Sequence, residues 1–357
     1  MKSNYDILGN HIRLIDTRNR ESITDRVLGI NIDKFFMPSV ANVIGTDLSK
    51  YKLITKGKFA CNPMHVGRDE RLPVALYDEE EPAIVSPAYF MFEVIDNSIL
   101  NEDYLMMWFR RPEFDRICWL HTDGSVRGGI TWDDICRLEL PIPPIENQLE
   151  IVNSYKAITE RIALKKKIND NLDDTAQTLY QKYFESNSDK SSWKQGTVGD
   201  VLQLQRGHDL PRTEMTGGKY PVAGSTGTIG YHDEFTAEAP VIVMGRSGNI
   251  GNPRLYLCNC WTHNTSLYVK QIYEAEPLWV FYLLKNLNYD GFVGGSAVPT
   301  LNRNDVHAYG IAIPPLELQK SFSQKVMSLI YCKEENLSEI EKLQELQKII
   351  LTTMSSR

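Results

Sequence analysis

The stretch LELPIPPIENQLEIV, Leu138–Val152, decides the fold, because the chain contains a second copy of it. The second copy is GIAIPPLELQKSFSQKV, Gly310–Val326. A shift of 171 residues superimposes the two proline pairs and places Gln148 on Gln319. Proline ends the hydrogen bonding of a strand and suits the first turn of a helix. Each copy therefore predicts a strand that ends at the prolines and a helix that begins there.

A second match shows that the repeat covers whole domains. ILGNHIRL, Ile7–Leu14, resembles TVGDVLQL, Thr197–Leu204, at an offset of 190 residues. The two offsets differ by nineteen, so the first copy is about nineteen residues longer. We expect the acidic stretch YDEEEP, Tyr77–Pro82, to hold some of that length. Two unrelated domains with similar ends are the alternative, but the long gapless agreement around the proline pairs favours a repeat.

Long helices are expected after both proline pairs. Apolar residues recur every three or four positions from Ile145 to Tyr183 and again from Leu316 to Met354, with only Lys333 breaking the second pattern. A helix of forty residues is about 60 Å long. Single apolar stripes of this length predict a coiled coil. Length alone allows either orientation, and we favour the antiparallel one, which holds the copies at opposite ends of a rod with approximate twofold symmetry.

Between these ends, each copy reads as short strands and turns with one apolar helical stretch. The helical stretches are Asn101–Arg111 and Glu276–Leu287. The pattern predicts an α+β protein with two similar mixed α/β domains. The expected division is a first domain at 1–144, a long helix at 145–185, a second domain at 186–315 and a second long helix at 316–357.

Composition limits the classes of partner. The chain has 357 residues and a formal charge of −7. Residues 1–144 hold 17 Lys and Arg against 22 Asp and Glu, and residues 186–315 hold 10 against 11. Because neither domain is basic, DNA binding would depend on local patches. Without a signal sequence, a long apolar run or a cysteine framework, we expect a cytoplasmic protein with reduced thiols and no membrane contact.

No motif for catalysis or for a metal is found in the sequence. Met244–Arg254 is rich in glycine but matches neither a dinucleotide nor a phosphate-binding loop. Cys258 and Cys260 have no partners at metal-ligand spacing. His263–Thr265 lacks a second nuclease element. We therefore predict no catalytic residue, no metal site and no cofactor bound by this chain.

Arginine, asparagine and glycine instead recur in the expected loops of both domains. Arginine and asparagine can form bidentate hydrogen bonds with guanine and adenine, and lysine contacts phosphate. Any one such loop could be ordinary charged surface, but together they favour DNA. The candidate DNA-binding residues are Arg18, Arg20, Lys56, Lys58, Arg68, Arg71, Arg127, Arg206, His208, Arg212, Arg246, Asn249, Asn264, Asn302 and Arg303.

The whole layout resembles the specificity subunit of type I restriction–modification systems. The resemblance is carried by the two proline-pair stretches and by the domain openings LGNHI, Leu8–Ile12, and WKQGTVGDVLQLQRG, Trp193–Gly207. The approaches SVRGGITWDDI, Ser125–Ile135, and GGSAVPTLNRNDV, Gly294–Val306, also look like that family.

This resemblance implies a non-catalytic subunit that reads a split double-stranded DNA target, one half-site per domain. Its helices would set the gap between the half-sites. Two methyltransferase (modification) subunits would bring S-adenosylmethionine, and two restriction subunits would bring translocation and cleavage with ATP and Mg²⁺. The acidic balance of this chain implies that its partners neutralise much of the phosphate charge.

Two other functions remain open from the sequence. An independent nuclease or methyltransferase would need the motifs that are missing here. A coiled-coil scaffold without DNA readout would keep the helices but would not need the arginines of the loops.

Overall fold

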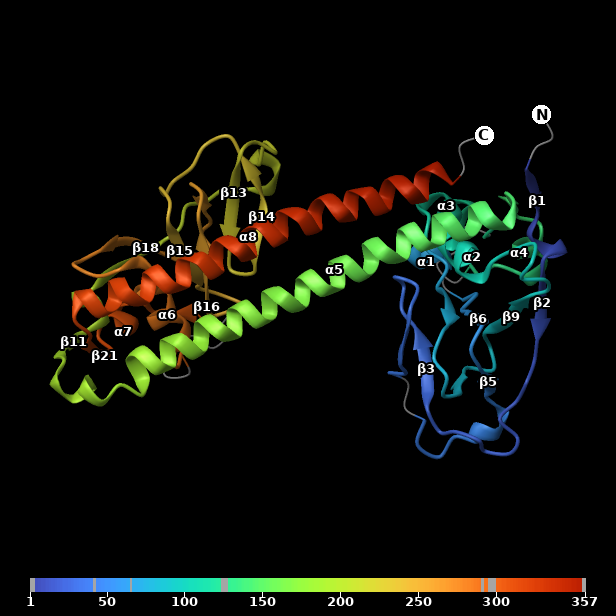
Figure 1. The fold of residues 1–357 in the computed structure, drawn as a ribbon, viewed down its shortest axis with the longest axis horizontal. Helices are drawn as coiled ribbons and strands as arrows, with labels where there is room; N and C mark the ends of the chain where they lie inside the picture. The colour runs from blue at the N-terminus through green and yellow to red at the C-terminus, as the bar shows by residue number, and fades with distance from the viewer. Residues whose placement is uncertain are drawn as a thin grey trace. The chain divides into compact units, whose positions relative to one another are not determined.

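The computed structural model describes residues 4–40, 43–64, 66–122, 128–289, 292–294 and 300–354, without the side chains of residues 68, 293 and 294. The chain forms two compact units. The first comprises residues 1–164 and 339–357, and the second comprises residues 165–338. Each unit holds one β-rich domain and a stretch of each of two long helices (Figure 1).

The first domain contains two four-stranded sheets. The larger apolar core lies on the antiparallel sheet β2–β9–β6–β7 and includes the stacked rings of Phe59 and Phe92. The second sheet has the order β4–β3–β8–β5, with β3 and β8 parallel. The strands are β1 (Tyr5–Ile7), β2 (Ile12–Ile15), β3 (Val27–Ile30), β4 (Phe36–Pro38), β5 (Lys52–Ile54), β6 (Lys58–Cys61), β7 (Val74–Tyr77), β8 (Ala83–Val85), β9 (Phe90–Val94) and β10 (Glu139–Pro141).

Short helices cover the core of the first domain. The helix expected from the apolar stretch at 101–111 is present as α2, whose N-cap Asn101 accepts a hydrogen bond from the backbone N–H of Tyr104. The α-helices of this domain are α1 (Val66–Asp69), α2 (Glu102–Phe109), α3 (Pro112–Leu120) and α4 (Trp132–Cys136).

The second domain has the same plan with shorter connections. Its main sheet has the order β12–β18–β15–β16, and its second sheet has the order β14–β13–β17. The strands are β11 (Lys194–Thr197), β12 (Leu202–Arg206), β13 (Tyr220–Gly224), β14 (Gly227–His232), β15 (Val241–Gly245), β16 (Gly251–Tyr256), β17 (Trp261–Thr262), β18 (Ser266–Ile272), β19 (Val293–Gly294), β20 (Thr300–Leu301) and β21 (Gly310–Ile313). Its helices are α6 (Pro277–Asn286), which was expected, and α7 (Arg303–His307).

Strand register confirms the internal repeat. Tyr5 pairs with Pro141 in the antiparallel pair β1–β10, and Gln195 pairs with Ala312 in β11–β21, which are the positions that the two offsets make equivalent. The stretch that was expected to hold some of the extra length holds little of it. The β7–β8 connection, residues 78–82, is only one residue longer than its counterpart 257–260. Most of the difference lies between β4 and β6, where residues 39–57 add strand β5, while residues 233–240 join β14 to β15.

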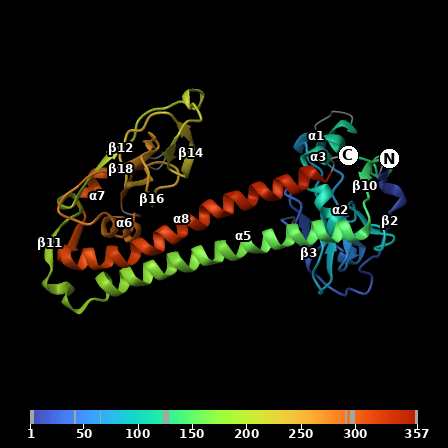
Figure 2. The ribbon, with the colours of Figure 1, turned by 45° about the horizontal axis from the view of Figure 1, so that its top comes forward.

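Both long helices begin directly after the proline pairs. They are α5 (Ile145–Tyr180), which continues into the π-helical segment η3 (Gln181–Glu185), and α8 (Leu316–Thr353). Ile162 of α5 packs against Ile340 and Leu343 of α8 within the first unit. Within each unit the two helices lie side by side and run antiparallel (Figure 2). The predicted α+β fold with two long antiparallel helices is thus confirmed.

Polar contacts interrupt the apolar seam of the helix pair in the second unit. Asn336 of α8 donates to the side-chain oxygen of Asn169 on α5 at 2.8 Å, and both residues are buried. Lys333, the one exception to the apolar pattern, forms an ion pair with Asp173 at 2.7 Å. A buried asparagine pair favours the register in which both amides have a partner. The exception in the sequence pattern is therefore a contact across the seam.

A repeated glutamine joins each domain to its long helix. The Nε2 of Gln148 donates to the carbonyl oxygens of Ile99 and Pro143, both at 2.8 Å, and its Oε1 accepts from the backbone N–H of Asn101 at 2.9 Å. In the second copy, Gln319 donates to the Pro314 oxygen at 2.9 Å and accepts from the N–H of Glu276 at 2.9 Å. Both glutamines are fully buried. Each amide thus holds the N-terminus of α2 or α6 against the start of a long helix.

Candidate nucleic-acid interface

Loops of the second domain are hydrogen-bonded to the segment that runs from Thr262 to Thr265. The backbone N–H of Arg246 donates to the Thr265 oxygen at 3.0 Å, and the N–H of Ser225 donates to its Oγ1 at 3.3 Å. In the loop after β12, the N–H of His208 donates to the oxygen of Thr262 at 2.7 Å. Backbone hydrogen bonds thus hold together the loops that carry the predicted polar residues. The side chains of these residues therefore project from neighbouring points of the surface.

Glycine is required at two points of this cluster. A Cβ on Gly207 would overlap the carbonyl oxygen of His263, and one on Gly245 would overlap the oxygen of Asn249. The chain passes so close to its neighbours at these points that no side chain fits. The glycines of these loops therefore serve loop-to-loop packing.

Three predicted arginines of the second domain lie around one pocket. Arg206, Arg246 and Arg303 line a pocket of about 460 Å³ with Asn302 and Thr300. The carbonyl oxygen of Arg246 accepts from the N–H of Leu301 at 2.8 Å, which joins this loop to β20. Within the described part of the chain, no carboxylate pairs with Arg246 or Arg303. Their charges are therefore available to an anion.

Beside these arginines, Asp209 and Asn264 line a second pocket of about 470 Å³. Asp209 accepts from Nη2 of Arg206 at 3.3 Å and also from the side-chain amide of Asn264. The apolar side chains of Met215 and Ile229 line the same pocket. This surface combines charge, an oriented amide and apolar contact, which are the elements of base-edge recognition.

The remaining predicted residues of the second domain lie around these pockets. His208 is exposed, and its ring centroid lies 6.2 Å from that of Trp261. Arg212 is exposed and lines the second pocket. Asn249 donates to the oxygen of Ser225 at 3.3 Å. Asn302 caps α7 by accepting from the N–H of Asn304 at 3.0 Å, so part of its hydrogen-bonding capacity is already used.

A histidine outside the prediction joins α7, which carries Arg303, to strand β12. Nε2 of His307 accepts a hydrogen bond from the backbone N–H of Leu204 at 2.8 Å, which requires the deprotonated nitrogen. Burial, together with the nearby charge of Arg303, lowers the pKa of His307 below its ordinary value of 6.5. At neutral pH this ring is therefore a structural acceptor.

The predicted cations of the first domain are mostly paired with acids. Arg18 forms an ion pair with Asp16 at 2.7 Å. Lys56 pairs with Glu80, and Lys58 pairs with the buried Glu93. Each pairing reduces the charge that a phosphate would meet.

Three other predicted residues of this domain are Arg20, Arg68 and Arg127. Arg20 is exposed and, in the described part of the chain, pairs with no acid. Arg127 and the side chain of Arg68 lie outside the described residues.

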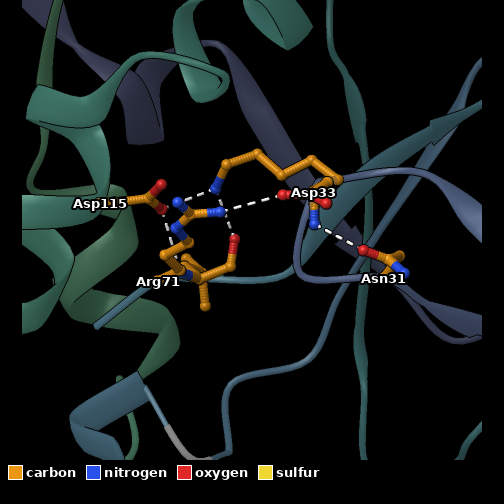
Figure 3. A network of polar contacts seen from close by, with 6 residues as sticks. Asn31, Asp33, Arg71 and Asp115 are labelled. Carbon is orange, nitrogen blue, oxygen red and sulfur yellow. Dashed lines mark hydrogen bonds and ion pairs between the residues drawn. The ribbon is translucent and has the colours of Figure 1, made fainter. Parts of the chain in front are cut away.

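Arg71 belongs to a network that includes a buried lysine (Figure 3). Its guanidinium donates to Asp33 at 3.0 Å. Next to it, Nζ of Lys34 donates to Asp115 at 2.6 Å and to the oxygen of Leu72 at 2.7 Å. Burial lowers the pKa of Lys34 below 10.5, although Asp115 opposes that shift. The network ties the β3–β4 turn to α3, which is a structural role.

Sequence reasoning missed the two acids that organise these surfaces, because it looked for cations. Asp209 follows Arg206 by three residues, and Asp33 is next to Lys34 in the chain. The short spacing of Asp209 from Arg206, a predicted DNA contact, is a signal that could have been used, whereas Asp33 lies far in the sequence from its partner Arg71.

The part of the chain that the structure describes contains neither a cluster of metal ligands nor a membrane-spanning helix. No group of three or more metal-ligating side chains occurs there. None of its helices is long and apolar enough to cross a membrane.

The sequence is similar to one kind of known protein. Residues 190–349 match the type I restriction modification DNA specificity domain. The chain is 21% identical over 397 residues to the putative type I restriction enzyme MjaX specificity subunit of Methanocaldococcus jannaschii, covering 98% of this chain and 88% of that protein. It is 24% identical over 191 residues to the type I restriction enzyme HindI specificity subunit of Haemophilus influenzae, covering 53% of this chain and 40% of that one.

Solved structures share the fold. The S subunit of the type I restriction–modification system from M. genitalium superimposes with a TM-score of 0.62 at 16% identity, covering 100% of this chain and 97% of that chain. A chain from a structural study of the assembly of the type I R-M system gives a TM-score of 0.51 at 16% identity, covering 98% and 96%. Repeat, fold and sequence similarity agree: residues 190–349 carry the type I restriction modification DNA specificity domain, and the whole chain is similar to specificity subunits of type I systems.

Proposed function

We propose that each domain reads one half of a bipartite double-stranded DNA target and that the long helices set the gap between the halves. The observation that carries this proposal is the duplicated main sheet, with each copy held to its long helix by an equivalent buried glutamine. The reading domains are residues 1–144 and 186–315, and the spacer helices are residues 145–185 and 316–357.

In the second domain, the arginine pocket supplies the contacts to DNA. Arg206, Arg246 and Arg303 would contact phosphates or guanine edges, and the asparagines around them would contact bases. The net charge of this domain is only −1. The rest of the domain therefore repels the phosphates of DNA only weakly, and local cations suffice to attract them. Among the described candidates of the first domain, Arg20 pairs with no acid, so its contacts to DNA would rely on that arginine and on cations that the DNA draws from their acidic partners.

As a specificity subunit the chain is itself non-catalytic and carries no cofactor. We propose that two modification subunits dock on the long helices and adjoining domains, and that two restriction subunits complete the complex. S-adenosylmethionine, ATP and Mg²⁺ would bind to those partners. Exposed apolar side chains support docking on the helices, because such groups on a surface favour protein contact. They are Leu149, Leu164, Ile168, Leu316, Tyr331, Leu337, Leu346 and Ile349.

A domain exchange tests the bipartite reading. The target is first found by mapping N6-methyladenine in the host genome with and without this gene. Residues 193–315 are then replaced by the second domain of another family member. We expect one half-site to change while the other half-site and the gap remain. A change in both half-sites would contradict separate reading.

An insertion tests the role of the helices separately. Whole helical turns inserted between residues 158 and 172 should lengthen the gap and leave both half-sites unchanged. The helix contacts on either side of the insertion would be displaced together, so assembly with the modification subunit is checked first. A change of half-site sequence with an unchanged gap would contradict the role of the helices as a spacer.

A scaffold without DNA readout is the alternative, and the paired cations of the first domain are the observation that favours it. Charge reversal of Arg246 and Arg303 to glutamate distinguishes the two functions. Lost sequence-specific methylation with intact assembly supports DNA reading, whereas unchanged methylation supports the scaffold.

A further inference from the structure

An acidic side chain lies among the predicted DNA contacts of the second domain. Asp209 is 71% exposed, and its Oδ1 accepts from both Arg206 and Asn264. A carboxylate at this place repels phosphate and reduces general affinity for DNA. Its contribution must therefore differ from that of the surrounding arginines.

The contact with Asp209 fixes which way the amide of Asn264 faces. An ionised carboxylate only accepts hydrogen bonds, so the amide must turn its NH₂ group toward Asp209. The carbonyl oxygen of Asn264 then faces the other way, and one N–H remains free for a ligand. An asparagine without such a partner can flip between two orientations of similar shape. Asp209 thus selects one of them.

Backbone contacts keep the two side chains together. The loop of Asp209 is hydrogen-bonded to the loop of Asn264 through His208 and Thr262, at 2.7 Å, and Gly207 packs against His263. Nε2 of His263 lies 3.3 Å from the oxygen of Leu210, which is a second link. The pair therefore has less freedom to lose on binding than two independent surface side chains.

The oriented amide matches one base. An asparagine that offers one carbonyl oxygen and one N–H can accept from N6 of adenine and donate to its N7 in the major groove. Next to Asn264, Met215 and Ile229 offer apolar contact of the kind that the methyl group of a paired thymine needs.

We propose that Asn264 reads the major-groove edge of one adenine in the half-site of the second domain and that Asp209 is the positioning residue that orients it. This inference rests on the proposed reading of a half-site by this domain. Asp209 acts on base discrimination through Asn264 and makes no favourable contact with the backbone of the DNA.

The test uses the assembled complex with its modification subunits. The substrates are duplex oligonucleotides that carry the mapped target, with each base pair of the second half-site, A·T or G·C, replaced in turn by the other pairs. Initial methylation rates give the discrimination at each pair for the unaltered complex, Asn264→Ala, Asp209→Asn and the double variant. A bidentate contact gives a discrimination of roughly tenfold to a hundredfold.

We expect Asn264→Ala to abolish that discrimination at one A·T pair and to leave the other pairs unchanged. Asp209→Asn should weaken discrimination at the same pair, and the double variant should equal Asn264→Ala, because one residue acts through the other. Binding to DNA of unrelated sequence should be equal or tighter with Asp209→Asn, since a repelling charge is removed. The matched control is Asp233→Asn, an exposed acid of the same domain, which should leave discrimination unchanged.

Three outcomes would overturn the proposal. Unchanged discrimination at every A·T pair in both single variants is the first. Relaxed discrimination at a G·C pair instead of an A·T pair is the second, and additive effects of the two substitutions are the third. If Asn264→Ala does not assemble, Asn264→Ser takes its place. If the unaltered complex shows no preference in this half-site, the proposed function itself fails, which is a distinguishable result.

Discussion

The two domains have one architecture and two different charged surfaces. Their main sheets have the same strand order. In each domain the first strand pairs with the strand that leads into the proline pair, as β1 with β10 and β11 with β21. In the first domain, Arg18, Lys58 and Arg71 each pair with an acid. In the second, the described residues provide no acid for Arg246 or Arg303. The duplication preserved the contacts that build the sheets, while the loop surfaces diverged.

The largest expected difference between the domains concerns the buried pair of Lys34 and Asp115, which has no equivalent among the described ion pairs of the second domain. Lys34→Met would leave Asp115 without its cation, and losing one partner of a buried pair costs about 3–5 kcal/mol. Urea denaturation would measure the loss. Hydrogen exchange should place it in the β3–β4 turn.

The control for this change is a second substitution at Asp115 that removes the charge and keeps a hydrogen-bond acceptor for a backbone N–H. Asp115 also accepts from the N–H of Leu72 at 3.0 Å, and an asparagine could do the same. Lys34→Met with Asp115→Asn should therefore recover much of the lost stability. A double variant as unstable as the single one would show that packing of the lysine stem matters more than its charge.

The buried glutamines should have equal effects in the two domains. Gln148→Leu and Gln319→Leu each leave buried backbone groups without partners, at a cost of roughly 2–3 kcal/mol. Gln344→Leu, the same change at an exposed position of α8, is the control and should have little effect. Thermal unfolding of the three variants measures this. A large loss in only one domain would show that the joints are not equivalent.

The arginines should distinguish the domains in DNA binding. Arg246→Gln and Arg303→Gln should each reduce the salt dependence of binding by about one unit of slope, because each removes one phosphate contact. Arg71→Gln, the same change in the first domain, should have a smaller effect because Asp33 already neutralises its charge. Titrations of duplex DNA at several salt concentrations provide the measurement. Equal slopes for all three variants would remove the contrast between the two surfaces.

The smallest effect concerns the short helix before each proline joint. Thr131 and Asp134 form a reciprocal cap on α4, and Asp134→Asn should cost roughly 0.5–1 kcal/mol. The hydrogen bond from Thr131 lowers the pKa of Asp134 below 3.8. This stabilisation is present above pH 3.8 and is lost as the pH falls through the lowered pKa. Asp305→Asn, at the equivalent position of α7, is the control. The free energy of unfolding of both variants, measured from pH 6 to pH 3, tests the prediction.

The repeat and the long helices could be predicted because their signals are local. A proline pair, a glutamine at a fixed spacing and an apolar residue every three or four positions are visible in the sequence. The partners of Gln148 and Lys58 are not visible, since Ile99 and Glu93 reach them only through folding. The availability of Arg246 likewise depends on which acids the loops bring near it. Fold could thus be predicted well, whereas the charges open to a ligand could not.

The buried glutamines have a consequence for inheritance. Among the described residues, Gln148 and Gln319 bond to main-chain groups alone, which any sequence provides as long as positions 101 and 276 are not proline. A domain acquired by recombination between related genes would find the same anchor whatever its side chains. New DNA specificities could then arise in one genetic event, without matching mutations in the helices.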